Sequence, residues 1–202
     1  MKPVLTALFA VMLIAGCSAT PATQATYYRL PDRTQAGRIQ VEQTAPVLVI
    51  ERLQLAGFLL QSGLVMQQGE SLLQVSRQHL WAESLDVALH KALQSALQIA
   101  TTDVHVYLQG PDFVATTDYT LRLQIDNFQA TDAGLVLLSG RYQLVDTKAG
   151  TELVRRNFSF NRPLDEDGYP HVVSLLQSLL ESLASRISED LATTMQTGNS
   201  AP

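Results

Sequence analysis

Two segments with helical periodicity, separated by strand-like alternation, limit the folds that this chain can adopt. In residues 81–99, and again in about 170–194, apolar side chains recur every three or four positions, as on one buried helix face. Between them, residues 119–126 alternate apolar and polar side chains, which is the period of a half-buried strand. The order predicts an α+β fold, with an antiparallel sheet and two long helices packed on one of its faces.

Further short strands are predicted around the first helix and after it. Apolar or alternating runs bounded by glycine, proline or polar clusters occur at 27–30, 47–50, 64–68, 71–77, 104–108, 134–146 and 153–160. Gly69 is predicted to turn a hairpin, and Gly134 and Gly150 mark turns in a meander. Residues 58–60 fit no pattern and receive no assignment.

The N-terminus has the pattern of a bacterial lipoprotein signal. Lys2 precedes an apolar run from Val4 to Ala15, which is too short to cross a bilayer and has the length of a signal-peptide core. The run ends in small residues directly before Cys17, the single cysteine of the chain. We therefore expect residues 1–16 to be removed and Cys17 to carry the lipid, whose several acyl chains make a lasting anchor.

The rest of the chain divides into a tether, one domain and a tail. Residues 17–26 are small and polar after the cysteine and are predicted to form a flexible tether of roughly 30 Å at most. Residues 27–195 are expected to form one periplasmic domain, and 196–202 a disordered tail. Ser18, in place of an aspartate, favours sorting to the outer membrane, with the domain facing the periplasm.

Composition and motifs argue against several function classes. The formal charge is −5 and there is no basic run, which disfavours nucleic-acid binding and attraction to anionic head groups. No nucleophile elbow, phosphate loop or zinc-protease motif occurs, so we predict no enzyme, cofactor or metal. Glu83, Asp86 and His90 share a helix face, but a solvated polar stripe explains them better than a metal site.

Four residues are candidates for an interface. Trp81 is the single tryptophan, and it is predicted either to belong to the core or to anchor a partner. Glu83 lies beside it in the Trp-Ala-Glu segment. Leu59 and Leu60 face either the core or a neighbouring molecule. The wide leucine stripe of the last helix is predicted to face the core, but the leucine pairs at 175/176 and 179/180 widen it enough for part of it to meet another subunit or a lipid chain.

Several of these segments together resemble a known family. The lipoprotein signal is followed by Tyr-Tyr-Arg-Leu at 27–30, an apolar strand at 47–50 and Gly-Leu-Val-Met at 63–66. His-Leu-Trp-Ala-Glu-Ser-Leu at 79–85 is the most recognisable piece. In their order and spacing over residues 26–194, these segments are similar to the ABC-type transport auxiliary lipoproteins, the PqiC/YmbA group.

The resemblance implies a non-enzymatic partner in lipid transport. Members of the family sit in the outer membrane, receive an MCE-domain protein that spans the periplasm, and are expected to form homo-oligomeric rings. Cys17 is the one residue whose role carries over. A lipid-anchored assembly or chaperone factor for another outer-membrane machine is the alternative, and a periplasmic hydrolase is a third, less favoured one.

Overall fold

A single long strand, β7 (Tyr119–Thr131), organises the sheet in the computed structural model, which describes residues 24–31, 41–110 and 116–198. On one side it pairs antiparallel with β8 (Leu135–Asp146), which pairs antiparallel with β9 (Thr151–Pro163). Gly134 and Gly150 have positive φ angles at the two turns, which glycine adopts without strain. The predicted meander is therefore confirmed.

On its other side, β7 pairs with three short strands arranged one after another along its length. They all run parallel to it: β2 (Val47–Ile50), β3 (Gln54–Leu55) and β4 (Gly63–Gln68). The sheet continues from these through parallel β2–β6, antiparallel β4–β5 and parallel β5–β1 pairs, with β6 at His105–Leu108, β5 at Leu72–Trp81 and β1 at Thr26–Tyr28.

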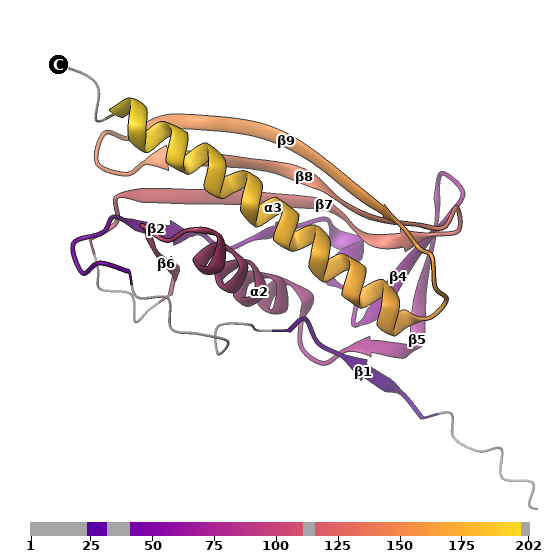
Figure 1. The fold of residues 1–202 in the computed structure, drawn as a ribbon. Coiled ribbons are helices and arrows are strands. Elements are labelled where there is room, and N and C mark those ends of the chain that lie inside the picture. The colour runs from indigo at the N-terminus through magenta and orange to yellow at the C-terminus, as the bar shows by residue number, and fades with distance from the viewer. Residues whose placement is uncertain (1–23, 32–40, 111–115, 199–202) are drawn as a thin grey trace, which may run out of the picture.

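The predicted α+β class is confirmed, and the sheet is mixed (Figure 1). Antiparallel pairing holds in the meander and in the β4–β5 hairpin, where Gly69 has a φ of 58°. The parallel pairs join segments far apart in the sequence, such as Leu48 and Tyr119. Such partners leave no local turn signal in the sequence, so the parallel part of the sheet was not predicted.

The two helices cover one face of the sheet. Helix α3 (Tyr169–Gly198) lies diagonally across β7, β8 and β9, and α2 (Leu85–Ala100) lies beside it near β6 (Figure 1). The leucine stripe of α3 faces the core as predicted, and Leu180, Leu183 and Ile187 are fully buried. One apolar core therefore fills the space between the helices and the sheet.

Two predicted boundaries differ in the structure. Trp81 ends β5 and does not begin a helix, because its N–H donates to the carbonyl of Ser62 and it pairs with Tyr28. Helix α2 starts at Leu85, after Ser84. Helix α3 continues to Gly198, so residues 196–198 of the predicted tail are helical, and 199–202 lie outside the described residues. The unassigned segment forms a short 3-10 helix, η2 (Gly57–Leu60).

The polar side of α2 is not a solvated stripe along its whole length. His90 Nε2 lies 3.2 Å from the carbonyl oxygen of Ile50 in β2. Gln94 donates to the carbonyl of Val106 in β6 at 3.0 Å, and Gln98 donates to the carbonyl of Val104, just before β6, at 3.1 Å and accepts the N–H of Val106 at 3.0 Å. These side chains tie the helix to the edge of the sheet, so the prediction of a solvated stripe is corrected for this part of α2.

A buried polar contact fastens α3 to the meander. Asp190, only 9% exposed, accepts hydrogen bonds from the hydroxyl of Tyr142 at 2.5 Å and from Nε of Arg156 at 2.6 Å. Burial, and then this hydrogen bond, raise the pKa of Tyr142 well above its ordinary value. The three side chains link α3, β8 and β9 across the core.

Candidate interaction surface

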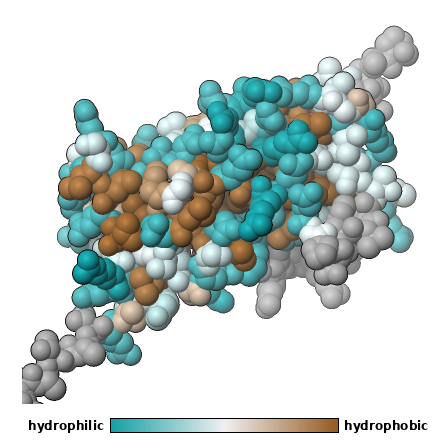
Figure 2. Space-filling view, turned by 180° about the vertical axis from the view of Figure 1, so that it is seen from behind, coloured by the Kyte–Doolittle hydropathy of each residue, from teal (hydrophilic) through white to brown (hydrophobic). Residues whose placement is uncertain are grey.

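The face of the sheet opposite the helices has no helix packed on it among the described residues (Figure 1). In β7, Leu121 and Leu123 point to the helices, so Arg122 and Gln124 point to the other side. Arg155 and Arg156 are neighbours in β9 and point to opposite faces, because Arg156 reaches Asp190 on α3 and Arg155 lies on the uncovered face. Figure 2 shows this uncovered face, with polar and apolar areas side by side.

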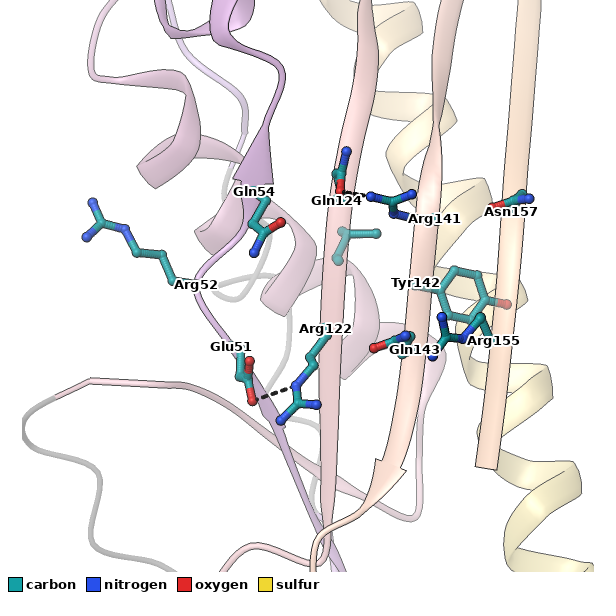
Figure 3. A pocket seen from close by; sticks show the side chains of 11 residues that line it. Glu51, Arg52, Gln54, Arg122, Gln124, Arg141, Tyr142, Gln143, Arg155 and Asn157 are labelled. Carbon is teal, nitrogen blue, oxygen red and sulfur yellow. Dashed lines mark hydrogen bonds and ion pairs between the residues drawn. The ribbon is translucent and has the colours of Figure 1, made fainter. Parts of the chain in front are cut away.

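A shallow groove of about 510 Å³ runs across the polar part of this face (Figure 3). Its floor consists of two crosswise rows, in which guanidinium and carboxamide groups alternate between neighbouring strands. The rows are Arg122–Gln143–Arg155 and Gln124–Arg141–Asn157. Glu51, Arg52 and Gln54 form one wall.

The charges of the groove are largely compensated. Arg122 Nε donates to Glu51 at 3.0 Å, and Arg155 makes a forked contact with Glu152, whose pKa it lowers. Arg141 Nη2 donates to the neutral Gln124 oxygen at 2.6 Å, and Gln124 is oriented by Asp126. These groups can hold polar or anionic surfaces of a partner, and their chemistry suits binding rather than acid–base or nucleophilic catalysis.

The apolar part of the uncovered face lies at the β4–β5 end (Figure 2). Leu73 pairs with Gln67, and Val75 pairs with Val65. Gln67 lies beside Thr131, which is on the face of β7 away from the helices, so both pairs point away from the helices as well. Leu72, the next residue of the hairpin, points to the helix side but lies exposed as well. We call Leu72, Leu73 and Val75 the hairpin patch.

The four predicted interface residues fall into two groups. Trp81 and Leu59 are buried, and Trp81 packs 6.3 Å from Phe128 between ring centroids. Leu60 is exposed, and Glu83 forms an exposed ion pair with Lys91 at 2.7 Å. Only Leu60 and Glu83 therefore present side chains that a partner can touch without opening the core.

An aromatic cluster that was not predicted joins the first strand to the start of α3. The His79 ring stacks on Tyr169 at 3.8 Å, and the Tyr28 hydroxyl lies 3.0 Å from His79 Nδ1. Tyr28 belongs to β1, the first described strand after the tether. His79 and Tyr169 lie at least 51 positions from Tyr28 in the sequence, so periodicity alone gives no signal for these contacts.

The Glu83, Asp86 and His90 face carries no metal-like cluster. Each residue is engaged elsewhere: Glu83 with Lys91, Asp86 with Arg52 at 3.5 Å, and His90 with a backbone carbonyl. Within residues 24–31, 41–110 and 116–198, no group of three or more metal-ligating side chains comes together.

Cys17 and the predicted signal peptide lie outside the described residues. Among the helices that are described, neither is both long and apolar enough to span a membrane.

Sequence comparisons place the chain among envelope lipoproteins. The family described as the ABC-type transport auxiliary lipoprotein component matches residues 28–188. The intermembrane transport lipoprotein PqiC of Escherichia coli K12 is 25% identical over 182 residues, covering 90% of this chain and 94% of that protein. The PqiC of Shigella flexneri matches to the same extent.

Two solved structures share the fold. A protein of Xanthomonas campestris has a TM-score of 0.68 at 16% identity, covering 88% of this chain and all of that one. An uncharacterised protein has a TM-score of 0.70 at 22% identity, covering 83% and 99%. The family match spans most of the chain, from the last residue of β1 into α3. The chain therefore belongs to the ABC-type transport auxiliary lipoprotein family.

Proposed function

We propose that this protein is an outer-membrane lipoprotein, anchored through Cys17 and facing the periplasm, that docks the MCE-domain protein of an intermembrane lipid transport system. The observation that carries the proposal is the family match over residues 28–188. The signal-like N-terminus that ends at Cys17 supports the anchor, and Ser18 supports the membrane. In this role the chain binds and positions a partner and performs no chemistry, and it contributes to the integrity of the envelope.

The uncovered sheet face supports a docking role. The groove offers alternating guanidinium and carboxamide donors from three neighbouring strands, which suits polar contacts with a protein surface. Leu60 and Glu83 are further accessible contacts. The family resemblance also leads us to propose that several copies form a ring around the docked partner.

Affinity capture of the native lipoprotein from membranes tests the proposal. An MCE-domain protein is expected in the captured material, and Cys17→Ala, which removes the acylated sulfur, is expected to reduce its recovery by releasing the domain from the membrane. Repeated recovery of other envelope machines without an MCE-domain protein would contradict the docking role and favour an assembly factor. Cross-linking before extraction reports the number of copies.

Charge reversal at the groove tests the proposed docking surface. Arg141→Glu is expected to lower recovery of the partner, because it places a carboxylate among groups that now donate hydrogen bonds. Arg162→Glu, an exposed arginine of β9 outside the groove, is the matched control and should leave recovery unchanged. Equal losses in both variants would show that the groove is not the docking surface.

A further inference from the structure

The hairpin patch exposes apolar surface that needs a covering. Leu72, Leu73 and Val75 are 59%, 37% and 40% exposed and lie within four residues of β5. Successive strand residues point to opposite sides, so Leu72 emerges on one side of the ribbon, and Leu73 and Val75 on the other. The hairpin is thus apolar on both sides near its turn.

The same part of β5 is also a free edge. β1 pairs only with residues 79–81, so Leu72 to Gln78 have no strand on that side within the described residues. Exposed apolar edges of this kind are a hazard for aggregation in water, and proteins normally cover or charge them. Glu70 and Arg77 are the only formally charged residues between Gly63 and Trp81, so the segment is not protected by charge.

The position of the tether indicates what covers the patch. β1 runs parallel to the last three residues of β5, from the Thr26–His79 pair to the Tyr28–Trp81 pair, so the tether joins the domain at the β5 edge of the sheet (Figure 1). Leu72 precedes His79 by seven residues, and since β5 shifts its register against β4 in this stretch, the two lie at most roughly 23 Å apart. The stretch from Cys17 to Thr26 can span about 30 Å. A lipid on Cys17 can therefore lie level with the hairpin patch.

The two-sided exposure distinguishes a membrane from a protein partner. A single flat protein surface covers only one face of a ribbon, so a second copy of the chain or another protein has to enclose the turn to cover both sides. The interfacial region of a bilayer surrounds an inserted segment and contacts both of its sides. The scarcity of charge in the hairpin keeps the cost of leaving water low, and no attraction to anionic lipids is needed.

We infer that the turn half of the β4–β5 hairpin inserts the hairpin patch into the surface of the membrane that holds the Cys17 lipid. The inference rests on the proposed anchoring through Cys17. The hairpin is then a second attachment point, which fixes the orientation of the domain on the membrane. The groove lies on the same sheet face, so its orientation relative to the membrane is then fixed, and the domain does not rotate freely on its tether.

The test uses the full lipidated chain reconstituted in phosphatidylethanolamine–phosphatidylglycerol vesicles. Because lipid blocks the sulfur of Cys17, the thiol of Leu72→Cys is the only one available for an environment-sensitive fluorophore. Its emission is expected to shift to the blue and to be quenched by lipids with brominated acyl chains. The matched label at Ala149→Cys, in the β8–β9 turn at the other end of the sheet, should remain in water.

A second variant tests whether the patch itself causes the insertion. Leu73→Ser combined with Val75→Ser should abolish quenching of the label at position 72, while the protein stays folded and vesicle-bound. Ile99→Ser removes an apolar side chain that is 49% exposed on α2 and should leave the quenching intact. If both changes abolish quenching, or neither does, the hairpin patch is not the inserting element.

The outcomes separate this inference from the proposed function. A chain that does not float with vesicles refutes the lipid anchor. A chain that floats while the label at position 72 stays in water overturns the insertion and leaves the anchor standing. A label that is shielded only at high protein density, without quenching by brominated lipids, shows that another copy covers the patch, which also overturns the inference.

Discussion

Substitution Asp190→Ala tests the contact that fastens α3 to the meander. It removes the acceptor of a 2.5 Å hydrogen bond and leaves the hydroxyl of Tyr142, a side chain that is only 1% exposed, without a partner. A hydrogen bond to a charged group contributes about 1.5–3 kcal/mol, and an unsatisfied buried hydroxyl costs a similar amount. Arg156 is half-exposed and regains water, so it adds little.

We therefore expect Asp190→Ala to lower the free energy of unfolding by about 2 kcal/mol, a large part of the roughly 5–15 kcal/mol of a typical domain. For a domain of this size, the melting temperature should fall by about 4–8 °C. Urea unfolding followed by the emission of Trp81 measures the change, because this single tryptophan is buried against Phe128.

The control is Glu189→Ala, one residue earlier on the same helix. Its carboxylate is exposed and lies 4.0 Å from Arg186, so stability should not change measurably. Tyr142→Phe in the Asp190→Ala background should cost nothing further, since the two side chains act as one unit. If Asp190→Ala and Glu189→Ala unfold at the same urea concentration, the proposed role of the contact is refuted.

Three further predictions concern a titrating residue, a close backbone approach and the anchor. Burial lowers the pKa of His90 from its ordinary value of 6.5, so the folded protein favours the neutral ring and should lose stability as the pH falls and the ring becomes protonated. In urea titrations, the stability of His90→Gln should decline less over the same pH range. Gly140→Ala places a Cβ 2.0 Å from a backbone oxygen and should cost about 1–3 kcal/mol in thermal unfolding, whereas Gly57→Ala, with open space around it, should cost far less. The Cys17→Ala protein should have an unchanged melting temperature and should be absent from the membrane fraction after ultracentrifugation. If it stays in the membrane fraction, a second membrane attachment is strong enough to hold the domain without the lipid.

The elements with strong periodicity could be predicted, and the contacts between them could not. The leucine stripe of α3 and the alternation of β7 are set by burial on one face, so the sequence carries them directly. Gln94 and Gln98 look the same in sequence whether they face water or a strand edge. Their bonds to β6 depend on where the sheet ends, which periodicity does not specify.

The candidate site shows the same division. The opposite orientation of Arg155 and Arg156 follows from strand geometry, because neighbouring residues of a strand point to opposite faces. The assembly of Arg122, Arg141 and Arg155 into one groove requires the register of three strands, which only the structure supplies. Trp81 was assigned to a helix start because its apolar spacing continues that of α2, yet pairing with Tyr28 keeps it in β5.

The strand β7 has a consequence for how the chain acquires its fold. The three strands that align along one of its sides lie in about the first third of the chain, and Met66 pairs with Ala130, which lies 64 positions later in the sequence. In a chain that emerges from its N-terminus, β4 can pair with β5 in their hairpin, but the edges of β2, β3 and β4 that face β7 stay open until β7 arrives, whereas α2 can form at once from local contacts. These open edges make the time between the emergence of the early strands and that of β7 the period of greatest exposure to aggregation and to chaperones.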